Sequence, residues 1–321
     1  MAAVDSFQLL YREISRSCGS YVETLALVGA LYTASRAVVL LTECCSLVRV
    51  HFLPKMIPNK KLGQRFGDWA VISDASEPVA KAYAEELAKH GINVAFITRD
   101  AASVQDAAAS FSQSYGVETA VIVADFSLGQ ASVIKPIQET LRDKDVGFLV
   151  NCVDESSASP LSLIEMSDQL LLGQVNRNVG ATTLMTRLVL PGMLQRSRGA
   201  VVNISSGANC RPWRGAATLS AVSGYLDSFS KALYFEYSSR GVFIQSLIPL
   251  QIASRGLPHT SSRESWFAPS PEVYARHAVS TLGISNRTTG YWPHTLQYGL
   301  MKCVPEWLWI LGSRTLIFTE N

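Results

Sequence analysis

The sequence predicts a parallel β-sheet covered by helices on both faces. Short apolar runs alternate with helix-length segments between Trp69 and Ile248. The runs show little polar alternation, which is typical of strands buried on both faces. The chain of 321 residues is long enough for one domain of roughly 200–250 residues with short extensions. We therefore expect an α/β fold with a doubly wound parallel sheet, a Rossmann-type three-layer α/β/α arrangement.

The elements follow one another in a steady order. Strand Trp69–Ser73 (WAVIS) leads into a helix at Pro78–His90, in which Val79, Tyr83 and Leu87 recur at i, i+4 and i+8. Further strands are expected at Asn93–Thr98, Thr119–Ala124, Val146–Asn151, Ala200–Ile204 and Val242–Ile248. Helices are expected at Ala101–Tyr115, near Ala131–Arg142, at Ser167–Leu190 and near Leu219–Tyr237. This alternation predicts βαβ crossovers throughout the domain.

A hydrophobic arm precedes this domain. Residues Thr24–Thr42 carry one charge, Arg36, and these nineteen residues as a helix would just span about 30 Å of hydrocarbon. An Arg near the middle costs about 2.5–3.5 kcal/mol on insertion scales. The arm therefore has three interpretations: a membrane span, a helix lying on a membrane, or an arm buried in a dimer. We expect an arm with a basic linker at 1–67, the main domain at 68–300 and a hydrophobic tail at 301–321.

The composition excludes several classes of function. Hydrophobic residues make up 48% and charged residues 17%, against roughly 25% charged in an average domain, which excludes a disordered chain. A net charge of +2 does not indicate the basic surface that binds nucleic acid, so no nucleic acid is expected as a partner. The six cysteines form no CxxC pair and the five histidines have no metal spacing, so no metal site is expected. A mean hydropathy of +0.16 indicates membrane contact somewhere.

Several segments resemble a known family. They are AKAYAEELAKHGINVAFITRD (Ala80–Asp100), KDVGFLVN (Lys144–Asn151), VVNISSG (Val201–Gly207) and HAVSTLGISNRTTGYW (His277–Trp292). Together they resemble the short-chain dehydrogenase/reductase family, in its 17β-hydroxysteroid and 3-ketoacyl reductase branch, and the hydrophobic arm also matches that branch. The resemblance implies a Rossmann fold and, in active members, NADP(H) as cofactor.

The family's phosphate cradle, TGxxxGIG, is degraded here. Its glycines let the backbone approach a pyrophosphate at a helix N-terminus. The corresponding stretch is SDASEPVA, with Ser73, Asp74, Ala75, Pro78 and Ala80 at family positions, and Asp74, Pro78 and Ala80 in place of the glycines. Asp74 places a carboxylate near a diphosphate, and two like charges about 4 Å apart repel by roughly 4 kcal/mol at an effective dielectric constant of 20. We expect the helix to begin normally, with Ser76 as N-cap, but the affinity for cofactor to be lost.

The family's catalytic pair, YxxxK, is also missing. By resemblance, Leu219 falls at the tyrosine position and Ser223 at the lysine position. Leucine has no proton to donate, and serine carries no charge at neutral pH. Tyr225 and Lys231 are poor substitutes because Tyr225 lies about 240° round the helix from Leu219 at 3.6 residues per turn. No intact catalytic residue is therefore expected on this helix.

The other family positions keep their residue types. They are Arg99, Asp125, Asn151, Asn178 and Ser206. The resemblance implies that Arg99 pairs with an adenosine 2′-phosphate, Asp125 contacts adenine, Asn178 holds a relay water and Ser206 polarises the substrate. After Asn151, Asp154 departs from the family pattern and adds another carboxylate near the cofactor floor. We interpret the five residues as remnants, because each has a structural role available, such as capping, bonding the backbone or facing solvent.

These observations predict a catalytically inactive family member, a pseudoenzyme with a binding or scaffold role. No cofactor is expected, and NADP(H) is the dinucleotide that would bind if any did. The expected partners are a protein or a lipid, with membrane contact through the arm and a homodimer through the helices at Ser167–Leu190 and Leu219–Tyr237. The alternative is an NADP-dependent hydroxysteroid or 3-ketoacyl oxidoreductase with an atypical site. The resemblance implies a mitochondrial location, with the endoplasmic reticulum membrane as the alternative.

Overall fold

The computed structural model describes residues 2–53, 62–127, 133–154, 163–211, 215–253 and 264–310. The chain forms two compact units, Met1–Arg49 and Val50–Asn321. This division falls within the arm and linker predicted at 1–67, and residues 54–61 of that linker lie outside the described residues. Residues 311–321 of the predicted tail lie outside them as well.

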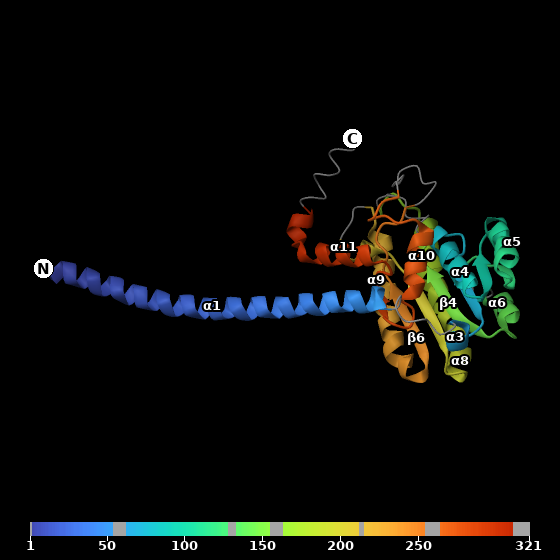
Figure 1. Cartoon of the computed structure of the whole chain (residues 1–321). Coiled ribbons are helices and arrows are strands. Elements are labelled where there is room, and N and C mark those ends of the chain that lie inside the picture. Colours follow the sequence, from blue (N-terminus) through green and yellow to red (C-terminus); the bar gives the residue numbers. More distant parts are fainter. Residues whose placement is uncertain are drawn as a thin grey trace. The chain divides into compact units, whose positions relative to one another are not determined.

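The first unit belongs to one long helix, α1 (Ala2–His51) (Figure 1). Nearly all of its described side chains before Val50 are exposed. The stretch Tyr21–His51, with a mean hydropathy of 1.7 in its most apolar window, is long and apolar enough to cross a membrane by length and composition. An exposed apolar helix of this length needs a partner or a bilayer to cover it.

The second unit is built on a parallel sheet. In the described part of the chain seven strands pair in the order β3-β2-β1-β4-β5-β6-β7. Their bounds are β1 (Trp69–Ser73), β2 (Asn93–Thr98), β3 (Thr119–Val123), β4 (Val146–Cys152), β5 (Gly199–Ile204), β6 (Val242–Leu247) and β7 (Arg287–Thr288). The order reverses between β1 and β4, which makes the carboxyl ends of these two strands the switch point of a doubly wound sheet. The predicted fold class is confirmed.

Helices cover both faces of the sheet because the strands bury side chains on both. Ala70 and Ile72 of β1 belong to one apolar core, and Trp69 and Val71 belong to the other. The first core is covered by α3 (Leu62–Phe66), α4 (Pro78–Lys89), α5 (Ala102–Tyr115) and α10 (Pro271–Ser280). The second is covered by α6 (Ile134–Leu141), α8 (Ala181–Gln195) and α9 (Ala217–Tyr237). The remaining helices are α7 (Asp168–Val175) and α11 (Trp292–Cys303).

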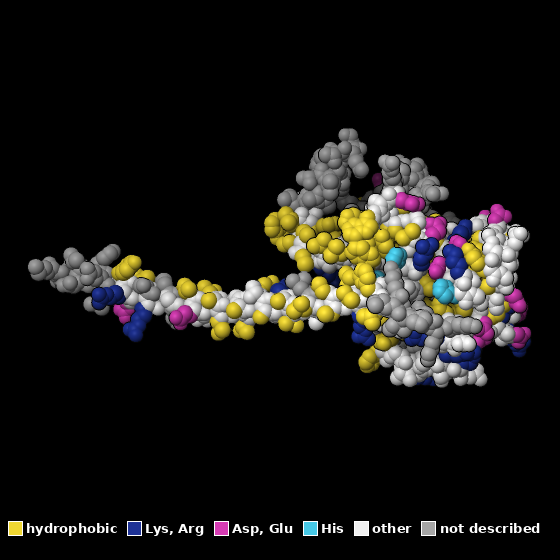
Figure 2. Space-filling view, in the orientation of Figure 1, with side chains coloured by type: hydrophobic (Ala, Val, Ile, Leu, Met, Phe, Trp, Pro, Cys, Tyr) yellow, Lys and Arg dark blue, Asp and Glu magenta, His cyan; other side chains and the backbone are white. Residues whose placement is uncertain are grey.

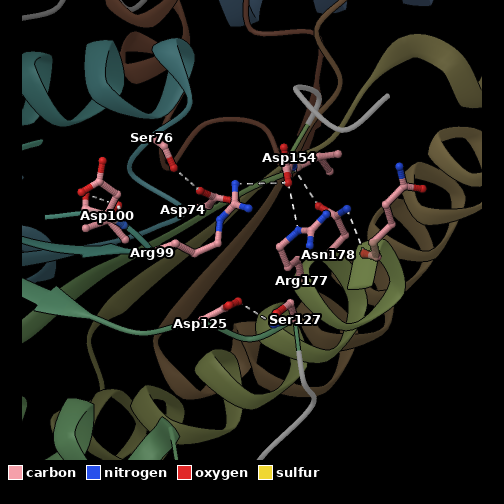
Figure 3. Close-up of polar contacts among 12 residues, drawn as sticks. Asp74, Ser76, Arg99, Asp100, Asp125, Ser127, Asp154, Arg177 and Asn178 are labelled. Atoms are coloured by element: carbon pink, nitrogen blue, oxygen red, sulfur yellow. Dashed lines mark hydrogen bonds and ion pairs between the residues drawn. The ribbon is translucent and has the colours of Figure 1, made fainter. Parts of the chain in front are cut away.

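The long helix predicted at Ser167–Leu190 is interrupted. It consists of α7, a π-helical turn at Asn176–Gly180 and α8. A π-helical turn inserts an extra residue and redirects the side chains around it, and such turns are frequent at functional sites. This one contains Asn178 and its neighbour Arg177, and both turn toward the carboxyl end of the sheet (Figure 3).

Candidate functional site

The carboxyl ends of β1, β2 and β4 converge at the switch point of the sheet, where ligands of open α/β sheets bind. Asp74 directly follows β1, Arg99 directly follows β2, and Asp154 lies two residues beyond β4. Figure 3 shows the side chains of Arg99 and Arg177 directed toward Asp154, with Asp74 beside them. The structure therefore brings two predicted positions, Asp74 and Arg99, together near the carboxylate of Asp154.

Asp154 is the centre of a buried charge cluster. Its Oδ2 lies 3.0 Å from Nε of Arg177 and 3.7 Å from Nη2 of Arg99. The side chain of Asp154 is 1% exposed and that of Arg177 is 11% exposed. Charges at this depth persist only when they are paired, so each partner depends on the other. The cluster stabilises residues 153–154, which directly follow β4, at the carboxyl end of the sheet.

Asn178 holds the same segment through its backbone. Its Oδ1 accepts a hydrogen bond from the backbone N–H of Asp154 at 2.8 Å, and its Nδ2 donates to the carbonyl of Gln174 at 3.0 Å. Asn178 is itself buried. In this arrangement its amide is engaged in positioning Asp154, which is a structural role of the kind expected for a remnant.

Asp74 combines a glycine-like backbone with a buried carboxylate. Its φ of +56° lies in the left-handed region, which glycine adopts freely and aspartate tolerates. Its Oδ1 accepts a hydrogen bond from the Ser76 hydroxyl at 2.6 Å. Burial raises the pKa of Asp74, and the charge of Asp154 raises it further, against the opposing effects of Ser76, Arg99 and Arg177. Asp74 thus keeps the left-handed backbone that a glycine would adopt at this turn, but it adds a side chain that a glycine lacks.

The start of α4 differs from the expectation in one detail. Glu77 is the N-cap and its side chain makes no capping hydrogen bond, and Pro78 occupies the first turn. The prediction of Ser76 as N-cap is wrong, because its hydroxyl bonds the Asp74 carboxylate instead. Pro78 has no N–H and Ala80 is completely buried, so these two positions offer no open backbone for a phosphate.

A small cavity lies among the described residues after β1 and β2. The cavity bounded by Ser73, Asp74, Thr98, Arg99 and Arg177 has a volume of about 20 Å³. That is room for about one water molecule, whereas ligand pockets usually measure about 300–1,000 Å³. This cavity among the described residues therefore has no room for any part of a dinucleotide in this conformation.

Two further predicted positions lie at the edges of the cleft. Asp125 accepts a hydrogen bond from the backbone N–H of Ser127 at 2.8 Å. Burial acts against its charged form, but the hydrogen bonds from Ser127 and the positive charges of Arg99 and Arg177 outweigh it, so the pKa of Asp125 is lowered. Asn151 is almost completely buried and donates from Nδ2 to Oδ1 of Asn203 at 2.8 Å. Asp125 is thus available as a carboxylate, while Asn151 is used within the sheet.

The two vacated catalytic positions lie on α9. Leu219 packs with Val153 and Val222 in a small apolar cluster. Ser223 is completely buried, and its hydroxyl has no hydrogen-bond partner among the described residues. Leu219 has no proton to donate to a carbonyl oxygen, and Ser223 supplies no positive charge beside one.

Tyr225 and Lys231 are engaged elsewhere. The Tyr225 hydroxyl lies 2.7 Å from Oγ1 of Thr183 on α8, and its ring stacks on Phe229 at 5.3 Å between centroids. Nζ of Lys231 pairs with Oδ2 of Asp227 at 2.7 Å. Because of these contacts, the Tyr225 hydroxyl and the Lys231 ammonium group do not form a tyrosine–lysine pair.

Ser206, the remaining predicted position, lies just beyond β5. Its hydroxyl accepts a hydrogen bond from the N–H of Ala208 at 3.5 Å, at the start of the 3₁₀-helical turn Gly207–Asn209. The hydroxyl therefore caps a turn, which is the structural role anticipated for it.

Sequence reasoning missed Arg177, although it noted Asp154. A signal was present: Arg177 is the only charged residue between Asp168 and Arg187, in a segment predicted to pack on the sheet. A single charge in such a segment needs a buried counter-charge, and Asp154 supplies it. The pairing joins residues 23 positions apart, so local periodicity could not reveal it.

The comparisons with known proteins agree with this geometry. The family model described as short chain dehydrogenase matches residues 68–264. The chain belongs to the short-chain dehydrogenase family. It is 54% identical over 99% of its length to a protein of Danio rerio named inactive hydroxysteroid dehydrogenase-like protein 1, covering 99% of that protein. The human protein of the same name is 49% identical over 98% of this chain and 96% of its own length. These names confirm the expectation of an inactive member.

Other relatives carry the name of an enzyme. The human very-long-chain 3-oxoacyl-CoA reductase is 34% identical over 78% of this chain and 79% of its own length. Among solved structures, one described for 7beta-hydroxysteroid dehydrogenase stereoselectivity matches with a TM-score of 0.67 at 24% identity, covering 78% of this chain and 98% of that one. A short-chain dehydrogenase from Sphingobium yanoikuyae, in complex with NADPH, matches with a TM-score of 0.59 at 18% identity, covering 79% and 96%. The structures support the fold, and the second shows that a protein of this fold binds NADPH.

Proposed function

We propose that this chain is an inactive short-chain dehydrogenase whose dinucleotide cleft is closed by its own side chains and whose role is to bind a protein partner or a lipid at a membrane. The observation that carries the proposal is the cluster of Asp154, Arg177 and Arg99 beside Asp74, which leaves a cavity of about 20 Å³. A short-chain dehydrogenase of the same fold has been solved in complex with NADPH.

The two carboxylates of the cleft also oppose the binding of a dinucleotide. A diphosphate entering the cleft would meet the carboxylates of Asp74 and Asp154. Each close like-charge contact is unfavourable by roughly 4 kcal/mol at 4 Å and an effective dielectric constant of 20. That corresponds to about a thousand-fold in affinity. Arg99, which by resemblance would attract a 2′-phosphate, already lies 3.7 Å from the Asp154 carboxylate.

Calorimetric titration of the full chain with NADPH tests this proposal. We expect no heat of binding at micromolar NADPH for the unmodified chain. The triple variant Asp74→Gly, Pro78→Gly, Ala80→Gly, combined with Asp154→Asn, should gain a measurable signal because both the cradle and the charge cluster are opened. Asp106→Asn, an exposed carboxylate on α5, is the matched control and should not bind. Micromolar binding by the unmodified chain would contradict the proposal.

A second candidate is an NADP-dependent hydroxysteroid or 3-ketoacyl oxidoreductase with an atypical site. It is favoured by the similarity to proteins named very-long-chain 3-oxoacyl-CoA reductase and by the presence of Asn178 and Ser206. It requires a proton donor that α9 does not supply. Reduction of a steroid or 3-ketoacyl ketone with NADPH, lost in Ser206→Ala, would establish it, and we expect no turnover in either protein.

The membrane role rests on α1. Tyr21–His51 has the length and composition of a membrane span, and we propose a mitochondrial membrane as its location, with the endoplasmic reticulum as the alternative. Cell fractionation followed by carbonate extraction tests both: the chain should stay in the pellet of one of these two membranes. Release into the carbonate supernatant would contradict an integral anchor.

A homodimer is the proposed assembly, formed through α7–α8 and α9. Its support is apolar exposure: Leu172 and Val175 of α7 are 61% and 41% exposed, and Phe235 of α9 is 89% exposed. The mass of the full chain in mild detergent, measured by light scattering after size exclusion, should correspond to two copies. A monomer mass that does not change with concentration would contradict the dimer.

A further inference from the structure

The outer face of α11 is apolar. Leu296 and Leu300 lie one helical turn apart and are 44% and 61% exposed. Pro293 and His294, on the inner face, are buried against the domain. A surface helix normally turns a polar face to solvent, so a helix that is apolar on both sides lacks a partner on the outer one. Figure 2 shows apolar side chains gathered over α11.

Two other segments extend this surface. Trp292 at the start of α11 is in ring contact with Trp266, with centroids 4.8 Å apart, and with Phe52, with centroids 6.2 Å apart. Phe267 packs edge-on against Trp266 at 5.1 Å. Trp307, beyond the end of α11, is 68% exposed. We call this surface the apolar platform, and its principal exposed members are Phe52, Trp266, Phe267, Leu296, Leu300 and Trp307.

The platform is held firmly and carries little charge. Between residues 292 and 310 the charged side chains are Lys302 and Glu306. The guanidinium of Arg211, in the segment after β5, donates hydrogen bonds to the carbonyls of Met301, Lys302 and Val304 and so caps the end of α11. The surface is therefore a fixed part of the second unit.

Chain continuity indicates what covers the platform. The candidate span Tyr21–His51 ends one residue before Phe52. Its last residue also contacts α11, because Nε2 of His51 lies 3.0 Å from Oγ1 of Thr295. At a rise of 1.5 Å per residue, a helix that enters a bilayer keeps the residues just beyond its end close to the membrane surface. Tryptophan and other amphipathic aromatic side chains are enriched at that level.

We propose that the apolar platform docks on the surface of the bilayer that α1 enters, with its aromatic and aliphatic side chains among the lipid headgroups and upper acyl chains. The inference rests on the proposed membrane role of α1 and adds a second, independent contact by the folded unit. The partner is a lipid surface, and the contact would fix the orientation of the domain on it.

The distribution of tryptophan makes this testable in the full chain. All six tryptophans lie in the second unit, the first of them at Trp69, and none lies in α1. Quenching of tryptophan emission by phosphatidylcholine with brominated acyl chains therefore reports on the folded unit alone. In vesicles we expect a clear loss of emission relative to unbrominated lipid, and this loss should shrink in Trp307→Phe and in Trp266→Phe.

Controls separate docking from anchoring. Trp69→Phe removes a buried tryptophan of β1 and should leave the quenched component in place. Leu300→Glu should abolish most of the quenching, while Phe235→Glu, which changes an exposed apolar residue of α9, should not. All variants should still float with vesicles because α1 is unchanged.

Two results would overturn the inference, and they differ from each other. A chain that floats with vesicles while its emission stays unquenched is anchored but not docked, and this result contradicts the proposed contact of the platform with lipid. A chain that does not float has no membrane anchor, which removes the proposed membrane role together with the docking. Neither result bears on the NADPH titration, so the closed cleft is tested separately.

Discussion

The cleft after β1 and the helix α9 differ in how the family's chemistry is replaced. The cleft is filled with charge: Asp74, Asp154, Arg99 and Arg177 occupy the space near the switch point. The vacated positions of α9 have instead become neutral, because Leu219 packs in an apolar cluster and Ser223 is completely buried. The structure of the cleft thus depends on ion pairs whose members stabilise one another. The two positions on α9 depend instead on ordinary packing.

The difference has a physical consequence. A buried ion pair is sensitive to the loss of either member, since the remaining charge stays in a poorly solvated place. A packed leucine or a buried hydroxyl can be changed with a smaller effect if the volume is kept. Substitutions in the cleft should therefore have large, charge-dependent effects on stability, and conservative substitutions on α9 should have small ones.

The largest expected effect is that of Asp154→Ala. The change leaves Arg177, with a side chain only 11% exposed, without the carboxylate that lies 3.0 Å from its Nε. Removing one member of a buried pair typically lowers stability by about 3–5 kcal/mol. Urea denaturation of the full chain should show a loss of this order in the free energy of unfolding.

Two further variants sharpen this result. The double variant Asp154→Ala, Arg177→Met should recover part of the loss, because neither member of the buried pair is then left without the other. Asp106→Ala, which changes an exposed carboxylate of α5, should stay within about 0.5 kcal/mol of the unmodified chain. Equal effects of Asp154→Ala and Asp106→Ala would show that the cluster contributes nothing to the fold.

The next largest effect is the contribution of Asp74 to the pH dependence of the free energy of unfolding. Burial raises the folded-state pKa of this carboxyl above its ordinary value of 3.8. The folded state therefore binds the proton more tightly than the unfolded state, and stability is lost as the pH rises from about 3.8 through the folded-state pKa. Asp74→Asn is neutral at every pH and tolerates the left-handed backbone. It should be more stable than the unmodified chain at pH 7, and this advantage should shrink as the pH falls toward 4.

Asp227 on α9 should behave in the opposite way. Burial opposes its charge, but hydrogen bonds from Lys231, Arg287 and Ser246 outweigh it and lower its pKa. It therefore contributes stability above its unfolded pKa of about 3.8, and this contribution is lost as the pH falls through the lower folded-state value. Asp227→Asn should be less stable than the unmodified chain at pH 7. Urea denaturation at several pH values compares both variants, and slopes of the same sign would contradict the assignment.

The sequence predicted the sheet better than it predicted the site. Apolar runs such as Trp69–Ser73 and Asn93–Thr98 became strands with the expected bounds, because burial on both faces leaves a local pattern. The π-helical turn at Asn176–Gly180 leaves no such pattern. It depends on packing between distant segments, and so does the partner of Arg177. The substitutions at the cradle and the added carboxylate of Asp154 could be seen in the sequence, but the pairing of Asp154 with Arg177 could not.

The smallest expected effect is that of Ser223→Ala. The hydroxyl of Ser223 is completely buried and has no hydrogen-bond partner among the described residues. A buried hydroxyl without a partner opposes folding by about 1–3 kcal/mol, and its removal leaves a cavity of one oxygen atom, which offsets part of the gain. The variant should therefore be as stable as the unmodified chain or more stable by up to about 1 kcal/mol. Ser230→Ala on the same helix is the matched control, because Ser230 donates to the Leu226 carbonyl and accepts from Asn203, so its loss should be destabilising. Equal losses of stability in the two variants would show that the Ser223 hydroxyl has a hydrogen-bond partner in solution. The description of this α9 position as an ordinary packed site would then be wrong.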